Sequence, residues 1–165
     1  MKTKDFTITF RGLKIGNHEF KYDLNDTFCE LYEFSDYSGL QGVVTLNMLK
    51  SETVFDLDYS FSGSIQAPCD ITNELYKQSL ENEFKMQVKF GDAFNDENDE
   101  ILILPHGEHA FNIAQTIYEL VVLSIPTKLN GPNAGNGLED FIDEQEEIEK
   151  ETDPRWDQLK NLLNK

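Results

Sequence analysis

His106, Glu108 and His109 lie close together in the stretch "PHGEHAF" and could bind a metal ion. Imidazole and carboxylate groups are common ligands of zinc, and a cysteine from elsewhere in the chain could complete such a site. A metal-dependent hydrolase is therefore one hypothesis for this protein. However, the stretch follows Pro105 and has no helical spacing that would fix the geometry of the three side chains. We favour a solvated strand-to-helix connection, and we predict no metal site.

Cys69, in the stretch "APCDIT", could act as a nucleophile with a distant histidine. It lacks the glycine-rich or elbow-like surroundings of a catalytic thiol, so we interpret it as a structural residue. With Cys29 it makes only two cysteines, which is too few for a disulfide framework and fits a reducing compartment. The glycines of "NGPNAGNG" have neither a strand before them nor an apolar helix after them, so they do not form a phosphate-binding loop. We therefore predict no catalytic residue, no cofactor and no enzymatic activity.

The elements that must position these residues are mostly β-strands in the first ninety residues. Apolar and polar residues alternate in several stretches, as is typical of strands with one buried face in an antiparallel sheet. The apolar positions of these stretches are Phe6, Ile8, Phe10; Phe20, Tyr22, Leu24; Val44, Leu46, Met48; Phe55, Leu57, Tyr59, Phe61, Ile65; and Leu80, Phe84, Met86, Val88, Phe90. Gly16-Asn17 predicts a hairpin turn between the first two stretches. The segment "QAPCDITN" predicts the turn between the two longest strands, and "ILIL" at 101–104 predicts a last, buried strand.

The pattern changes to helical spacing at residues 113–125. Asn112 and Gln115 have the types and spacing of a capping box at the start of this helix, and Pro126 ends it. Most of its surface is apolar, which predicts that it packs against the sheet. We expect an α+β fold: an antiparallel, strongly twisted or barrel-like sheet of about six strands, with one packed helix and a C-terminal helix.

The formal net charge of the chain is −17, and two stretches carry most of it. Residues 92–100 contain five acidic residues and no basic one, and residues 139–153 contain nine acidic residues against Lys150. Such stretches are most often solvated loops or disordered segments, but they also attract a basic partner. Direct binding to nucleic acid is disfavoured, because it requires a cluster of Lys and Arg, and the 14 basic residues are scattered.

The last residues predict a short amphipathic helix behind the acidic stretch. An aspartate that can cap it is followed by a proline, which is favoured at the first helical position. A helix of this length is not stable alone in water, so its apolar stripe must dock on the protein's own sheet or on a partner. The residues of this weak partner-binding site are Asp153, Pro154, Arg155, Trp156, Leu159 and Leu163.

Length and composition predict one globular domain with a hydrophobic core. We place this β-rich domain and its packed helix at 1–130, an acidic linker at 131–153 and the C-terminal amphipathic helix at 154–165. The amino terminus has no apolar signal region, and no apolar stretch approaches the length needed to span a bilayer. We therefore expect a soluble, cytoplasmic protein.

Three motifs, taken in order, resemble the YceD family, the large ribosomal RNA subunit accumulation proteins. They are the strand with its cysteine-bearing turn "FSGSIQAPCDIT", the apolar helix "FNIAQTIYELVVLSIPTKL" with Ile125-Pro126, and, after an acidic linker, "TDPRWDQLKNLL". Many members have a second cysteine three residues after the first, where this chain has Thr72. Many also have a cysteine cluster after the apolar helix, where this chain has "NGPNAGNG". A zinc-binding role therefore does not transfer to this chain.

The resemblance implies a non-enzymatic ribosome biogenesis factor that supports accumulation of large-subunit (23S) ribosomal RNA. In bacteria, the gene of the family commonly lies beside that of a small zinc-ribbon protein of the large subunit. An acidic protein is better suited to hold a basic ribosomal protein, or a pre-ribosomal particle through such a protein, than naked RNA. The alternative is a generic acidic interaction module that is unrelated to ribosomes.

Overall fold

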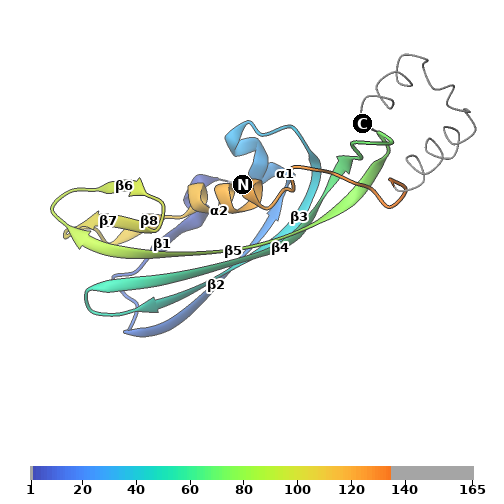
Figure 1. Ribbon diagram of the computed structural model, residues 1–165. Coiled ribbons are helices and arrows are strands. Elements are labelled where there is room, and N and C mark those ends of the chain that lie inside the picture. Colours follow the sequence, from blue (N-terminus) through green and yellow to red (C-terminus); the bar gives the residue numbers. More distant parts are fainter. Residues whose placement is uncertain (1, 135–165) are drawn as a thin grey trace, which may run out of the picture. The chain divides into compact units, whose positions relative to one another are not determined.

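A long, curved β-sheet forms most of the structure, a computed structural model that describes residues 2–134 (Figure 1). The chain divides into two units, Met1–Gly131 and Pro132–Lys165, and all the helices and strands described below belong to the first. The predicted C-terminal helix at 154–165 and most of the predicted linker at 131–153 lie outside the described residues. The same holds for the predicted site residues Asp153, Pro154, Arg155, Trp156, Leu159 and Leu163.

The main sheet has six strands in the order β2-β3-β4-β5-β7-β6. Their bounds are β2 Gly16–Asn25, β3 Ser38–Lys50, β4 Val54–Pro68, β5 Leu75–Gly91, β6 Asn95–Asn98 and β7 Ile101–Pro105. All neighbours are antiparallel except β5 and β7, which are parallel. A separate two-stranded sheet pairs β1 (Thr7–Thr9) with β8 (Ala110–Asn112). The predicted α+β class with a sheet of six strands is confirmed, but the sheet is only mostly antiparallel, because β5 and β7 are parallel, and it does not close into a barrel.

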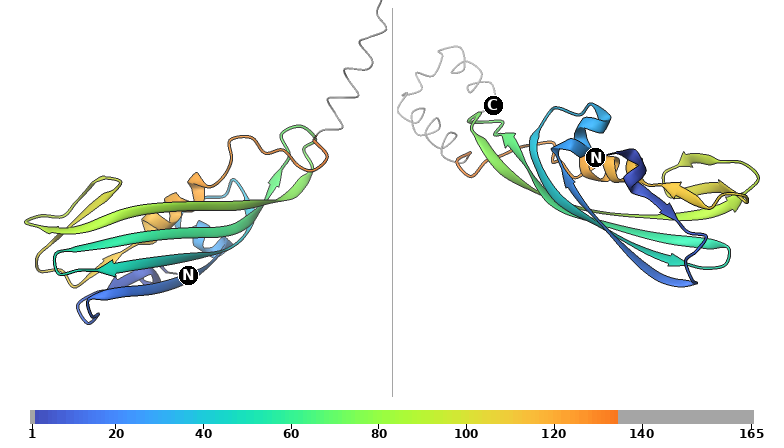
Figure 2. Two further views of the ribbon diagram at one scale, coloured as in Figure 1. Left: turned by 60° about the horizontal axis from the view of Figure 1, so that its bottom comes forward. Right: turned by 180° about the vertical axis from the view of Figure 1, so that it is seen from behind.

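Four short helical segments lie on one face of the main sheet (Figure 2). They are η1 Thr3–Phe6, α1 Asp26–Cys29, η2 Glu30–Tyr32 and α2 Ala114–Leu123. Helix α2 is the predicted apolar helix, and it buries Ile117, Leu120 and Val121 against the sheet. Not all of the apolar surface of this helix is packed, since Leu123 is 78% exposed. Within the described residues no helix is long and apolar enough to cross a membrane.

Burial follows the alternation predicted for β3, β4 and β5. Alternate side chains of these strands face the helices and are buried or half-buried, while most of the intervening ones are polar and exposed; Val43, Leu49 and Leu75 are apolar and exposed. The fully buried side chains at the centre are Leu46, Met48, Phe55, Leu57, Phe61, Leu80 and Val88. Each contributes about 2 kcal/mol of hydrophobic stabilisation relative to an exposed position. The predicted turn between the two longest strands is also confirmed, since β4 ends at Pro68 and β5 begins at Leu75.

The hairpin predicted at Gly16-Asn17 is wrong. Gly16 begins β2, which pairs with β3, whereas β1 pairs with β8. The chain turns earlier, where Leu13 N donates to Phe10 O at 3.2 Å. Lys50 Nζ fixes this turn by donating to the carbonyls of Phe10 and Leu13, both at 2.8 Å. The local turn signal was misleading because a distant strand supplies the partner of β1.

The acidic stretch 92–100 is not only a loop, because it contains β6 and then leads into β7. Strand β6 lies at the edge of the sheet, where its acidic side chains stay in solvent, so their charge does not oppose pairing. Strand β7 is the predicted "ILIL" strand, but it runs parallel to β5 and is not the last one, since β8 follows. Because β7 pairs in parallel with β5, the acidic stretch before β7 lies on the same side of β5 as helix α2.

The start of α2 differs from the predicted capping box. Asn112 belongs to β8 and pairs with Thr7, so the helix begins only at Ala114. Asn112 Oδ1 accepts from Ala114 N at 2.9 Å, and its Nδ2 donates to Thr3 O at 2.6 Å and to Thr7 Oγ1 at 3.0 Å. Gln115 donates to Glu119 Oε1 at 2.7 Å and does not reach back to Asn112. The side chain of Asn112 thus joins the amino-terminal segment to the beginning of α2.

Candidate functional site

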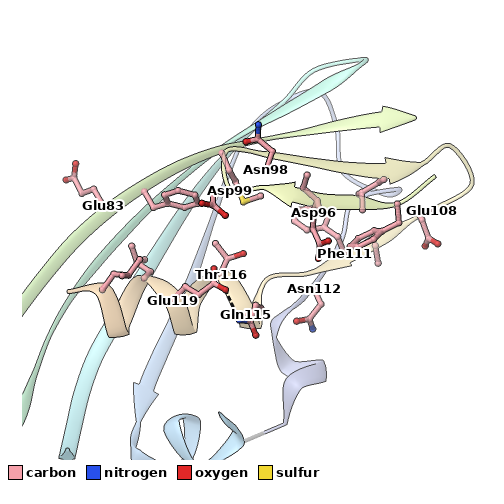
Figure 3. Close-up of a pocket in the computed structure, with 18 of the residues that line it drawn as sticks. Glu83, Asp96, Asn98, Asp99, Glu108, Phe111, Asn112, Gln115, Thr116 and Glu119 are labelled. Atoms are coloured by element: carbon pink, nitrogen blue, oxygen red, sulfur yellow. Dashed lines mark hydrogen bonds between the residues drawn. The ribbon is translucent and has the colours of Figure 1, made fainter. Parts of the chain in front are cut away.

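An elongated groove of about 1010 Å³ lies between β5, the β6–β7 hairpin and α2 (Figure 3). Its lining is apolar at the base, where alternate residues of β5 and β7 and one side of α2 meet. These apolar residues are Phe84, Met86, Leu102, Leu104, Phe111 and Leu120. The period of two along β5 and β7 brings the first four to the same face, because the two strands run side by side in register, whereas Phe111 comes from β8 and Leu120 from α2.

Hydrogen bonds hold the walls of the groove in place. Asn82 Nδ2 donates to Leu120 O at 3.1 Å and so connects β5 to α2. In the hairpin, the Oδ1 atoms of Asn95 and Asn98 accept from the backbone N–H groups two residues later, at 3.0 and 2.9 Å. Such asparagine turns stabilise a tight connection between short strands. Figure 3 shows Asp96 and Asp99 on this hairpin across the opening from Thr116 and Glu119 of α2.

The groove is acidic. Its lining includes five carboxylates and not one Lys, Arg or His: they belong to Glu83, Asp96, Asp99, Glu108 and Glu119. Charges of one sign along a cleft with apolar walls focus the electrostatic potential and attract ligands of the opposite sign. The remaining polar groups are amides and hydroxyls, and the lining contains no cysteine or serine. The arrangement is therefore suited to holding cationic and apolar side chains, and it offers no thiol or serine hydroxyl for nucleophilic catalysis.

Two large apolar side chains are exposed at the rim of this groove. Phe94, in the connection before β6, is 58% exposed, and Leu123, at the end of α2, is 78% exposed. Isolated exposed apolar residues are common on soluble proteins. Here they flank an apolar base, and this combination of apolar centre and charged surroundings is typical of a surface that binds another protein.

The three residues of the metal hypothesis are not assembled into a metal site. The ring of His106 stacks on Phe90 with the ring centroids 6.4 Å apart, and the backbone carbonyl of His109 accepts from Phe10 N at 3.0 Å. Glu108 lies at one end of the acidic groove. Across residues 2–134, no three His, Cys, Asp or Glu side chains lie close enough to hold a metal ion together. The stretch is a connection, as predicted, but it leads from β7 to the short strand β8 and not directly to the helix.

Cys69 occupies the turn between β4 and β5 and is buried there as a free thiol. The backbone N–H of Gly131 donates to its Sγ at 3.3 Å. Beside it, Asp70 N donates to Leu129 O, and Leu129 N donates to Asp70 Oδ2, both at 2.7 Å. These bonds attach the segment after α2 to the tip of the longest hairpin. A structural role for Cys69 agrees with this geometry.

The surroundings of Cys69 favour its thiolate. Hydrogen bonds from the Thr72 side chain and from the backbone N–H groups of Thr72, Gly131 and Ile71 lower the pKa of the thiol to about 7. Cys29 is the opposite case, because burial and the nearby Asp26 carboxylate raise its pKa. The two free thiols of the described structure therefore titrate in different pH ranges.

We expect the free energy of unfolding to depend on pH through Cys69. A thiol whose pKa is lowered by folding adds stability above its unfolded pKa, and this contribution is lost as the pH falls through about 7. The difference in unfolding free energy between the wild type and Cys69→Ser should therefore grow from about pH 6 to about pH 9. Urea unfolding at both pH values measures it. Cys29→Ser is the control, and a rise of the same size in that variant would contradict the assignment.

Sequence reasoning did not identify the groove. Its residues come from positions 82–123, and only the parallel pairing of β5 with β7 brings them together. The acidic stretch 92–100 was the one visible signal, because it places Phe94 among five acidic residues. Phe94 alone would not stand out in the sequence, and only the fold, which places it beside the apolar base, makes it part of a contact surface.

The comparison with protein families finds one match. Residues 57–163 match the family described as large ribosomal RNA subunit accumulation protein YceD. The matched region includes the turn of Cys69, the groove and α2. Comparisons with curated proteins and with solved structures give no match. Because the family match covers more than half of the chain, the protein belongs to the YceD family, as its motifs predicted.

Proposed function

We propose that this protein is a non-enzymatic ribosome assembly factor that supports accumulation of large-subunit (23S) ribosomal RNA by binding a basic protein partner. The family name supplies the connection to large-subunit ribosomal RNA. The acidic groove supports the binding of a basic partner, and it is the observation that carries the proposal.

The groove favours a protein over RNA as the direct ligand. Phosphate groups need cations, and the groove is lined by five carboxylates without a basic residue. Ribosomal proteins are rich in Lys and Arg, and their basic segments need a counter-charge until they meet RNA. Carboxylates beside an apolar base meet this need. The carboxylates pair with the charged ends of such side chains, and the apolar base packs against their aliphatic stems.

Genetic complementation tests the proposal. Deletion of the gene should lower the level of mature 23S ribosomal RNA, and expression of the wild-type protein should restore it. We expect the triple variant Asp96→Asn, Asp99→Asn, Glu119→Gln to fail in this rescue, because it removes the charges that face the opening while keeping the size of each side chain. Gel or sequencing profiles of ribosomal RNA measure the outcome.

A matched variant controls for the loss of net charge. Asp23, Glu30 and Asp36 are exposed and do not line the groove, so Asp23→Asn, Glu30→Gln, Asp36→Asn should rescue like the wild type. Normal 23S levels in the deletion strain would favour the alternative of a generic acidic interaction module. If the groove variant rescued fully, the groove would not be the site of action.

A further inference from the structure

Strand β5 is much longer than its neighbour on one side. It has 17 residues, of which Leu75–Lys89 pair with β4, whereas only Gln87–Gly91 pair with β7. Figure 2 shows the middle of β5 at the margin of the sheet, beyond the end of β7. Within residues 2–134 no strand pairs with this side of β5 before Gln87. The sheet therefore has an open edge next to the acidic groove.

The direction of the backbone groups along this edge follows from the pairing. Gln87 N donates to Glu100 O at 2.7 Å, on the β7 side and away from β4. The register between β4 and β5 is unbroken, so every second residue before Gln87 has the same orientation. The backbone N–H and C=O groups at positions 77, 79, 81, 83 and 85 therefore point to the open edge.

Two side chains of β5 bind edge groups at the positions that this alternation requires. Gln78 Nε2 donates to Ser79 O at 2.8 Å, and Asn82 Oδ1 accepts from Glu83 N at 3.0 Å. The Gln78 amide thus satisfies one backbone C=O group of the edge, and the Asn82 amide satisfies one N–H group, as the backbone of an added strand would. Within the described residues, no main-chain hydrogen bond on this side is found for Lys77, Glu81 or Lys85. Such unpaired groups are a template for the addition of another strand.

We propose that an extended, cationic segment of a partner protein adds to β5 at this edge as a strand in line with β7. The inference rests on the proposed function, in which the groove receives a basic protein, and it specifies how that protein is held. Backbone hydrogen bonds to residues 77–85 supply a ladder that is independent of sequence. Side chains of the added strand alternate between the two faces of the sheet, and those on the inner face extend toward Phe84 and the carboxylates of the groove.

Charge selects this occupant over a second copy of the same chain. Glu81 and Glu83 flank the open edge, and Asp99 and Glu119 line the adjoining groove. The two basic residues of this edge lie at its ends: Lys85, whose Nζ is 3.5 Å from Asp58 Oδ1, and Lys77. Edge-to-edge pairing of two copies would bring these acidic residues together in a chain of net charge −17, whereas a Lys-rich strand would neutralise them.

Two synthetic peptides test the backbone ladder without altering the protein. The first is an acetylated and amidated octapeptide of alternating Lys and Val, and the second is the same peptide with alternate backbone nitrogens methylated on its hydrogen-bonding side. Both have the same charge and side chains, but the second cannot donate to the edge. We expect the first to bind at least about tenfold more tightly, because the ladder contains several hydrogen bonds. Fluorescence anisotropy measures both affinities, and equal affinities would overturn the proposal.

Variants at Glu81 separate the backbone from the charge. Glu81→Pro removes an edge N–H without touching the ladder to β4, whereas Glu81→Gln removes only the charge. Glu81→Pro should weaken the unmethylated peptide by about tenfold and leave the methylated one unchanged, and Glu81→Gln should cost less than about threefold. If Glu81→Pro fails to fold, the two peptides with wild-type protein still decide the question.

The remaining outcomes separate this inference from the proposed function. If the methylated peptide binds as well as the other but both are lost with Asp96→Asn, Asp99→Asn, Glu119→Gln, the acidic groove binds cations without strand addition. If neither the methylation nor these substitutions affects binding, both proposals fail. Sedimentation measures the oligomeric state of the protein without peptide. If the wild type is a dimer and Glu81→Pro is a monomer, the edge binds a second copy of the chain, and the proposal is overturned.

Discussion

Gly63→Ala should lower the free energy of unfolding by about 3 kcal/mol, which is large for the addition of one methyl group. Gly63 of β4 pairs with Gly42 of β3, and the ring of Phe61 lies against both. A Cβ atom at position 63 would lie 2.8 Å from Gln41 O, 2.8 Å from Phe61 Cζ and 2.9 Å from Gly42 Cα. Two of these three neighbours are backbone atoms, so the two strands would have to separate.

Gly12→Ala provides the matched control for this variant. A Cβ atom at position 12 would meet nothing within 4 Å, and Gly12 has no positive φ. Alanine there should be neutral or raise the free energy of unfolding by up to about 1 kcal/mol, because it restricts the unfolded chain. Urea denaturation of the two variants measures the contrast. Equal stabilities of Gly63→Ala and Gly12→Ala would show that β3 and β4 adapt without cost.

Phe6→Ala should cost about 3–5 kcal/mol, the usual range for deletion of a buried aromatic ring. Phe6 is 0% exposed although it lies near the amino terminus, and its ring centroid is 5.0 Å from that of Phe28 and 5.3 Å from that of Tyr22. It thereby joins η1 to β2 and α1. The loss of the ring would leave a cavity where these elements meet.

Ile15→Ala serves as the comparison for Phe6→Ala. Ile15 is 65% exposed and close to Phe6 in the sequence, so its truncation should change the free energy of unfolding by less than about 0.5 kcal/mol. Thermal or denaturant unfolding distinguishes the two. A small effect of Phe6→Ala would mean that the amino-terminal segment contributes little to the stability of the fold.

Strands β2 to β5 could be predicted from the sequence because their signal is local. Alternation of the type Leu57, Tyr59, Phe61 reports directly which side of a strand is buried. The turn with Cys69 was equally visible, because Pro, Asp and Asn restrict the backbone at neighbouring positions. Where one face of a strand is buried, a slip by one residue would expose the whole apolar set, so register is also well determined.

The errors have a common physical cause, which is pairing between distant segments. Gly16-Asn17 has the local chemistry of a hairpin turn, but β1 obtains its partner from residues 110–112. The same is true of the candidate site, since the parallel pairing of β7 with β5 decides that Asp96 and Asp99 face α2. Single-residue patterns contain no information on such pairings. The acidity of the site was visible in the sequence, and its location was not.

Hydrogen bonds, and not further cysteines, hold the segment after α2 at the turn that contains Cys69. The resemblance to the family suggests a second cysteine three residues after Cys69. Thr72 occupies that position and forms a hydrogen bond with the Cys69 thiol. The later cluster is replaced by a stretch that contains Gly131, whose N–H donates to Sγ. Hydrogen bonds thus attach the segment after α2 to the β4–β5 turn, and no metal ion is required for this contact.

The pairing of β1 with β8 also determines the order in which the protein folds. Strands β3, β4 and β5 are joined by short connections and can pair as soon as each has been synthesised, whereas Thr7 must wait for Asn112. Closing so large a loop costs entropy that only an existing surface can offset, so the amino-terminal strand joins last. We therefore expect the contacts of Phe6 and Ile8 to form after the rate-limiting step, so that their loss would accelerate unfolding and leave the folding rate nearly unchanged.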